Sequence, residues 1–129
     1  MKASEFRKLY GRIPARTTVR KSHTNARKVD TPHGRFDSQG EYKRYVELAD
    51  MQGRGLIHQL HRPGSLPLLG ADGARVKGYK PDFCYVETGM IIYEDFKGRR
   101  FRELPTIIKL WQSTYPDIEL RITGPGARP

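Results

Sequence analysis

The chain has 129 residues and a mass of 14.8 kDa, the ordinary size of one domain with a single hydrophobic core. Its one cysteine, Cys84, excludes an intrachain disulfide, and its position between Phe83 and Tyr85 predicts a buried core thiol. No apolar run approaches the roughly 20 residues of a membrane helix, and the N-terminus lacks a secretory signal, so we expect a cytosolic protein without membrane contacts.

The net charge of +10 is unevenly distributed along the chain. Residues 1–30 contain nine Lys or Arg residues against two acidic residues, a balance of +7, which leaves +3 for residues 31–129. Each Lys or Arg that meets a phosphate releases condensed counterions, so the segment suits a polyanion such as nucleic acid. A solubilising tail and an organellar transit peptide are the alternatives.

We therefore predict that residues 1–32 form a basic, partly disordered arm and that residues 33–129 form the folded domain. A short helix is expected over residues 4–13, and residues 14–35 lack apolar periodicity, which predicts a loop. The predicted nucleic-acid contacts come from the arm and from a later basic pair: Arg16, Arg20, Lys21, Arg27, Lys28, Arg99 and Arg100.

A helix is predicted over residues 38–53. Ser38 suits the N-cap position, and Gly53 ends the periodic stretch. Its apolar stripe consists of Tyr42, Tyr45, Val46 and Ala49.

Short strands are predicted over residues 56–62 and 65–69, followed by a polar loop over residues 70–78. Two alternating runs, residues 79–86 and 90–97, predict a hairpin around Glu87, Thr88 and Gly89. A helix over residues 104–116 has Pro105 in its first turn and Trp111 on its buried stripe, and a last strand follows at residues 118–123. This order predicts an α/β protein whose mixed sheet is flanked by helices.

The predicted hairpin brings two aspartates together. If Thr88 and Gly89 form a two-residue turn, Asp82 lies directly opposite Asp95, and two such carboxylates repel each other unless one is protonated or a cation lies between them. Strand alternation places Lys97 on the same face as Asp95, and Glu94 on the other face. Oxygen ligands suit Mg²⁺ or Mn²⁺, and a lysine beside such a metal is typical of phosphodiester hydrolysis. The alternative is an exposed ion pair with no catalytic role.

Taken together, the segments FDSQGEYKRYVEL, GLIHQLHR, YKPDFCY, YEDFKG and KLWQSTYPDIELRI resemble the PD-(D/E)XK nuclease superfamily, which has the restriction-endonuclease-like fold. More closely, they are similar to a small family of phage and prophage proteins. The resemblance covers about residues 33–123 and implies the element order α-β-β-β-α-β.

The resemblance also implies roles for individual residues. The metal ligands would be Glu41 from the first helix, Asp82 and Asp95, with Lys97 as the catalytic lysine and Lys109 as a second lysine facing the site. Two of these have structural alternatives. Glu41, three residues after Ser38, fits a capping box, and Lys109 fits a solvated helix position.

The expected function is therefore a Mg²⁺- or Mn²⁺-dependent DNA endonuclease, acting in the host cytoplasm if it is phage-encoded. Small members of the superfamily include Holliday-junction resolvases, which cut branched DNA as dimers, and a duplex nickase or a repair nuclease are further possibilities. The alternative from another class is a non-catalytic nucleic-acid-binding protein that retains the fold.

Overall fold

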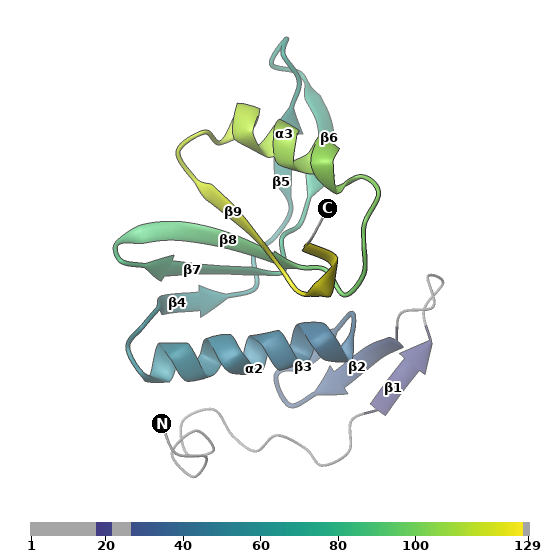
Figure 1. Cartoon of the computed structure of the whole chain (residues 1–129), viewed down its shortest axis with the longest axis vertical. Coiled ribbons are helices and arrows are strands. Elements are labelled where there is room, and N and C mark those ends of the chain that lie inside the picture. The colour runs from purple at the N-terminus through teal and green to yellow at the C-terminus, as the bar shows by residue number, and fades with distance from the viewer. Residues whose placement is uncertain (1–17, 22–26, 128–129) are drawn as a thin grey trace. The chain divides into compact units, whose positions relative to one another are not determined.

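The computed structural model of the chain describes residues 18–21 and 27–127, and it divides into two compact units, Met1–Leu56 and Ile57–Pro129 (Figure 1). The helix predicted over residues 4–13 lies outside the described residues, and so does Arg16. None of the helices in the described part of the chain is long and apolar enough to cross a bilayer.

The first unit contains a three-stranded antiparallel sheet that the sequence did not predict. Its strands are β1 (Thr18–Lys21), β2 (Arg27–Thr31) and β3 (Gly34–Phe36), in the order β1-β2-β3. Val29 lies opposite Phe36, and both side chains are fully buried. The prediction of a loop over residues 14–35 is therefore wrong for these segments, because one buried side chain on each of β2 and β3 anchors strands that are otherwise polar.

Helix α2 (Gln39–Gly53) packs against β2 and β3 within the same unit. The predicted N-cap is confirmed, since the Ser38 hydroxyl accepts a hydrogen bond from the Glu41 backbone N–H at 3.1 Å. The helix also ends at Gly53, as predicted. Aromatic rings fill its contact with β3, where Phe36 lies 5.1 Å from Tyr42 and 5.2 Å from Tyr45 between ring centroids.

The second unit is built on a four-stranded mixed sheet in the order β4-β7-β8-β9 (Figure 1). Strand β4 spans His58–His61, β7 spans Phe83–Glu87, β8 spans Met90–Phe96 and β9 spans Glu119–Thr123. The β4–β7 and β7–β8 pairs are antiparallel, whereas β8 and β9 run parallel and are connected through helix α3 (Leu104–Thr114). The chain is thus an α/β protein with a mixed sheet, as the element order predicted.

A second, two-stranded sheet is formed by β5 (Leu66–Leu69) and β6 (Arg75–Tyr79), between β4 and β7 in the sequence. The prediction of a polar loop over residues 70–78 is wrong for the β6 part, because its sequence RVKGY carries a single buried residue, Tyr79. The hairpin is tied to α3, since Leu69 N–H donates to the Thr114 hydroxyl at 3.0 Å and the Tyr115 hydroxyl donates to the Pro67 carbonyl at 2.7 Å.

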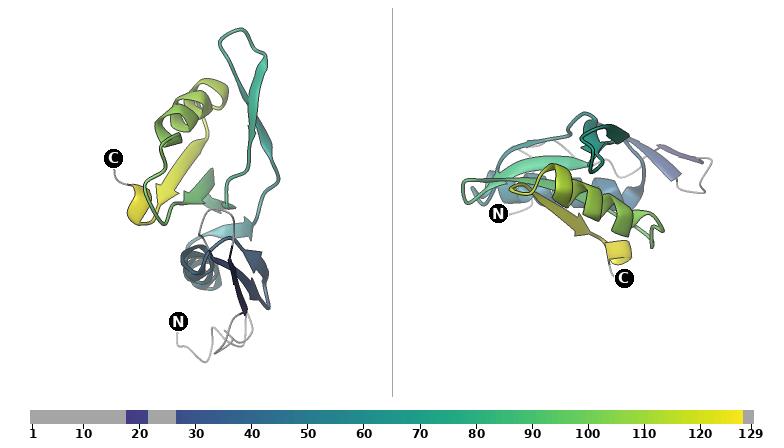
Figure 2. Two further views of the ribbon diagram at one scale, coloured as in Figure 1. Left: turned by 90° about the vertical axis from the view of Figure 1, so that its right-hand side faces the viewer. Right: turned by 90° about the horizontal axis from the view of Figure 1, so that it is seen from above.

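Helix α3 lies alongside the β5–β6 hairpin and β9 (Figure 2). The core of this unit contains Leu68, Tyr79, Ile107 and Trp111, with Tyr93 of β8 packed against it. Trp111 is 2% exposed, and its indole N–H donates to the Ile118 carbonyl at 2.8 Å, which confirms that it is a core residue. Cys84 is also buried and unpaired, as predicted.

Candidate active site

The turn between β7 and β8 has the geometry that the sequence predicted. Thr88 and Gly89 both have positive φ angles, 48° and 78°, as a two-residue turn of type I′ requires. The register runs from Glu87 opposite Met90 to Phe83 opposite Glu94. Because the turn fixes the register, every residue at the far end of the hairpin is placed on a defined face of the sheet.

Asp82 directly precedes the first paired residue of β7 and is half-buried. Its Oδ2 atom accepts a hydrogen bond from the Phe96 backbone N–H at 2.7 Å. This contact attaches the carboxylate to the end of β8, next to Asp95. The predicted proximity of Asp82 and Asp95 at the open end of the hairpin is therefore present.

Asp95 is buried, and its Oδ2 atom receives two donors. The Lys97 Nζ atom lies 3.1 Å from Oδ2, and the Tyr79 hydroxyl donates a short hydrogen bond to the same oxygen. Because both contacts use Oδ2, Oδ1 remains the oxygen that can face a further ligand. The side chain of Asp95 is only 4% exposed and that of Lys97 is 21% exposed, so the pair is much better shielded from water than an ordinary surface ion pair.

The Tyr79 hydroxyl lies in a buried environment close to the negative charges of Asp95 and Asp82. Burial raises the pKa of its hydroxyl far above its usual value, and the charges of Asp95 and Asp82 raise it further. Tyr79 therefore stays protonated and keeps donating to Asp95. The sequence analysis did not identify this residue, and the only available signal was the general need of a buried tyrosine hydroxyl for a partner.

Glu94 lies on the opposite face of the sheet from Asp95, as the alternation predicted. It is fully buried and accepts hydrogen bonds from the Tyr85 hydroxyl at 2.7 Å and the Thr123 hydroxyl at 3.0 Å. Arg121 contacts the same Tyr85 hydroxyl at 3.4 Å. Glu94 thus belongs to a separate polar network within the sheet.

The backbone of Lys97 is held on both sides by the C-terminal part of the unit. Its N–H donates to the Thr123 carbonyl at 2.9 Å, and its carbonyl accepts from the Gly126 N–H at 2.8 Å. Gly126 lies in the short 3₁₀ helix η1 (Pro125–Ala127), and a Cβ atom there would come within 2.0 Å of the Arg99 carbonyl oxygen. Only glycine fits this approach, which fixes the chain directly after β8.

The predicted third ligand, Glu41, belongs to the first unit. It is 4% exposed, and its Oε2 atom accepts a hydrogen bond from the Asp37 backbone N–H at 2.9 Å. This arrangement resembles the capping box that was the structural alternative, except that the carboxylate reaches the residue before the N-cap. Asp82, Asp95 and Lys97 lie together in the second unit.

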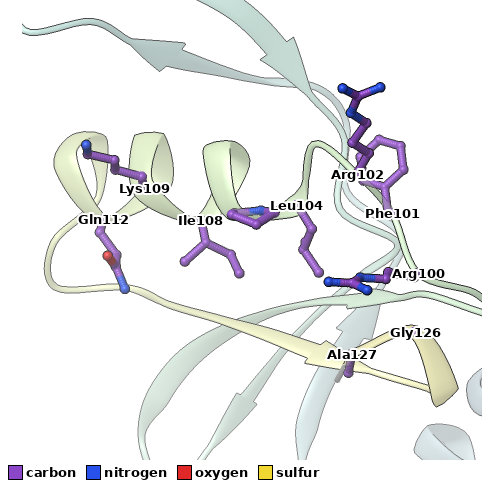
Figure 3. Close-up of a pocket in the computed structure, with 10 residues that line it drawn as sticks. Arg100, Phe101, Arg102, Leu104, Ile108, Lys109, Gln112, Gly126 and Ala127 are labelled. Atoms are coloured by element: carbon purple, nitrogen blue, oxygen red, sulfur yellow. The ribbon is translucent and has the colours of Figure 1, made fainter. Parts of the chain in front are cut away.

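Lys109 lies on the exposed side of α3, two residues from Ile107 of the buried stripe and so about 200° around the helix from it. It lines a pocket of about 750 Å³ between this helix, the loop of residues 100–102 and η1 (Figure 3). Neither Asp95 nor Lys97 is among the lining residues. Phe101 connects the two places, because it lines the pocket and its ring centroid lies 4.5 Å from Lys97 Nζ.

The described residues that the sequence predicts to contact nucleic acid lie in both units. The register of the first sheet pairs Arg20 with Lys28 and Lys21 with Arg27, which places four positively charged residues at two successive positions of the β1–β2 pair. Arg99 and Arg100 follow β8 and are exposed, and Arg100 lines the pocket.

Within the described residues, no group of three or more His, Cys, Asp or Glu side chains is arranged to hold a metal ion. The carboxylates of Asp82 and Asp95 remain the pair of neighbouring oxygen ligands at the hairpin. Searches of protein-family models, of curated proteins and of solved structures found no match to the chain.

Proposed function

We propose that the chain is a metal-dependent nuclease that hydrolyses phosphodiester bonds, with Asp82, Asp95 and Lys97 at its catalytic site. The observation that carries this proposal is the contact between Lys97 Nζ and the buried Asp95 carboxylate at 3.1 Å, next to Asp82 at the open end of one hairpin. A surface ion pair would not require an acid as deeply buried as Asp95.

The donor set at the hairpin suits a hard divalent cation. Mg²⁺ is commonly held by one or two carboxylates together with substrate phosphate oxygens, and Asp82 and Asp95 supply two carboxylates at the ends of neighbouring segments. Tyr79 orients Asp95 through its hydrogen bond, as outer partners of metal ligands do. We propose Glu41 as a third ligand on the basis of the family resemblance alone.

When bound, Mg²⁺ or Mn²⁺ would supply Lewis acidity that activates water and offsets the charge of the phosphate. Lys97 contributes a positive charge beside Asp95, where it can donate a hydrogen bond to a phosphate oxygen or orient the attacking water. The backbone of Lys97 is fixed through Thr123 and Gly126. Its ammonium group is positioned by the contact with Asp95.

The topology supports the family resemblance. If the sheet β1–β3 before α2 and the inserted β5–β6 hairpin are both set aside, the order of the remaining helices and strands is α2, β4, β7, β8, α3, β9, which matches the α-β-β-β-α-β order expected for the restriction-endonuclease-like fold. The substrate that we propose is DNA, because of the net charge of +10 and the basic segments. Branched DNA, cut by a dimer of the Holliday-junction-resolvase type, is the leading possibility.

The test is a cleavage assay with purified full-length chain. A four-way junction, a linear duplex, a single strand and an RNA are each incubated with Mg²⁺, Mn²⁺, Ca²⁺ or EDTA, and the products are separated on a denaturing gel. We expect cleavage of at least one substrate in Mg²⁺ or Mn²⁺ and little or none in Ca²⁺ or EDTA. Binding to every substrate without cleavage would favour the non-catalytic nucleic-acid-binding protein instead.

A further inference from the structure

The pocket between α3, the loop of residues 100–102 and η1 combines apolar side chains with positive charge. The apolar side chains Leu104 and Ile108 point from the helix toward the β9–η1 segment, and Pro105 adds to the same surface (Figure 3). Arg100, Phe101 and Arg102 lie at one end, and Lys109 and Gln112 lie at the other. Its volume of about 750 Å³ is within the range of about 300–1,000 Å³ that is typical of sites for small ligands.

The charge of the pocket is unbalanced. Arg100, Arg102 and Lys109 are all exposed, and none of the residues that line the pocket is acidic. No ion pair engages these three cations within the described part of the chain, and Glu103, the acid nearest in sequence, is paired with Lys77 at 3.4 Å. The pocket therefore favours a ligand that carries negative charge.

The apolar wall restricts the kind of anion. Contact with Leu104 and Ile108 would not strengthen the binding of inorganic phosphate, and the three cations would not strengthen the binding of a purely apolar ligand. A nucleotide has both features, because the base presents an apolar face and the phosphates carry the charge. Along the axis of α3, Leu104 and Lys109 are about 7.5 Å apart, more than the rise of about 3.4 Å per nucleotide in a duplex strand, so an extended strand can place successive phosphates at the two ends.

We infer that this pocket binds an unpaired nucleotide of the strand that is cut, next to the scissile phosphate, which would lie at Lys97 and at a metal ion held by Asp82 and Asp95. This inference rests on the proposed function for the identity of its ligand. Phe101 is the connecting residue, since it lines the pocket and its ring centroid lies 4.5 Å from Lys97 Nζ. In a duplex both faces of each base are covered by neighbouring bases, so only a nucleotide outside the stack can contact Phe101 and Ile108.

The experiment separates base contacts from phosphate contacts. Full-length chain is titrated in EDTA, which prevents metal-dependent cleavage, against a fluorescently labelled mixed-sequence single strand, an abasic strand of the same length and a duplex of the same sequence. We expect the base-bearing strand to bind about 5- to 100-fold more tightly than the abasic strand, because a stacked base contributes about that much. Phe101→Ala should remove most of this difference without changing the affinity for the abasic strand.

Two matched variants complete the design. Val76→Ala removes a similarly exposed apolar side chain from β6, away from the pocket, and should leave the difference between the two strands unchanged. Lys109→Ala should weaken binding of both strands by the same factor, since a phosphate contact does not depend on the base.

The inference is overturned if base-bearing and abasic strands bind equally well, or if polyglutamate of matched charge displaces the base-bearing strand as readily as the abasic one. The second result would identify a general anion or acidic-peptide surface. The outcome is distinct from that of the cleavage assay. A chain that cuts DNA but binds both strands equally refutes the pocket assignment alone, whereas base-dependent binding without cleavage refutes the nuclease alone.

Discussion

At the scale of single residues, the two adjacent acids of β8 have different environments. Asp95 contacts Lys97 and Tyr79 on one face of the sheet, and Glu94 is enclosed by Tyr85 and Thr123 on the other. One carboxylate has a lysine beside it and an oxygen left for a ligand, and the other has its donors within the sheet. Their substitution should therefore have different consequences.

We expect Asp95→Asn to lower cleavage by at least about 100-fold, because it removes a charge that would hold the metal, whereas Glu94→Gln should retain most of the activity. Glu94→Gln should instead lower the free energy of unfolding by about 1–3 kcal/mol, since an amide cannot accept from both hydroxyls as a carboxylate does. Cleavage rates and urea denaturation of both variants provide the measurements. Loss of activity in Glu94→Gln at a temperature where it is folded would contradict the assignment.

Tyr79 gives a second prediction at this scale. Tyr79→Phe removes the donor to Asp95 and should lower Mg²⁺ affinity or the cleavage rate by about 10- to 100-fold. Tyr115→Phe is the matched control, because it removes a hydroxyl that donates to the Pro67 carbonyl at 2.7 Å, with no carboxylate involved. If the two variants require the same Mg²⁺ concentration and cut equally fast, Tyr79 has only a structural role.

The same substitution should change the alkaline stability of the protein. The pKa of Tyr79 is raised in the folded chain, so it ionises first in the unfolded chain, at an ordinary pKa of about 10. Its contribution to stability is thus fully present below about pH 10 and is lost as the pH rises above that value. Denaturant unfolding between pH 9 and 11 should show a shallower decline for Tyr79→Phe than for the unaltered chain.

At the scale of elements, the contact between η1 and the segment that follows β8 depends on a glycine. Gly126→Ala would place a Cβ atom within 2.0 Å of the Arg99 carbonyl oxygen, so one of the two segments must move. We expect a loss of about 1–3 kcal/mol in unfolding free energy together with slower cleavage, because the Gly126–Lys97 hydrogen bond holds the catalytic lysine. Gly64→Ala is the control, since no atom lies within 4 Å of its Cβ position, and it should be neutral or slightly stabilising. Equal stability and activity of the two variants would show that Lys97 does not depend on this contact.

The elements that the sequence predicted well have strong local signals. Ser38 identified the start of α2, and Thr88-Gly89 determined the register of β7 and β8, which in turn placed Asp82 and Asp95 together. The missed strands lack such signals. Among residues 28–31 of β2 only Val29 is buried, and in β6 the charged Arg75 and Lys77 alternate with the exposed Val76 and the half-buried Gly78, so their strand structure depends on pairing partners.

In the candidate site, too, residues with a local sequence signal were predicted and residues that depend on long-range contacts were missed. Asp95 and Lys97 are two residues apart, so alternation along one strand was enough to place them on one face. Tyr79 is sixteen residues from Asp95, and Phe101 reaches Lys97 from a loop. No local pattern relates either position to the site, and only the folded chain brings these side chains to the carboxylate and the lysine.

At the scale of the whole molecule, part of the positive charge of residues 1–30 belongs to the paired strands β1 and β2. Deleting residues 1–30 would remove β2 and with it the buried Val29, so such a deletion would test folding and binding together. The nucleic-acid hypothesis is better tested by neutralising side chains at the β1–β2 pair while the strands are kept.

We expect the combined change of Arg20, Lys21, Arg27 and Lys28 to Gln to weaken nucleic-acid binding and to lower the slope of log affinity against log salt by roughly three. A control chain with the same net charge carries Gln at four exposed positions elsewhere: Lys43, Arg54, Arg62 and Arg75. Its slope should fall much less. If both chains lose affinity and slope equally, the contacts follow net charge and do not depend on the β1–β2 segment.

The attachment of Lys97 to β9 and η1 also bears on the order of folding. The β7–β8 hairpin is local and can form within about 1–10 μs, whereas the parallel pairing of β8 with β9 must wait until α3 has crossed over the sheet. The carbonyl of Thr123 and the N–H of Gly126 therefore reach Lys97 late in folding. In partly folded chains the hairpin would already hold Asp82 and Asp95, but the backbone of Lys97 would not yet be fixed by β9 and η1. We therefore expect hydrolytic activity to appear only with the last cooperative folding step. In refolding experiments, activity should recover later than hairpin formation.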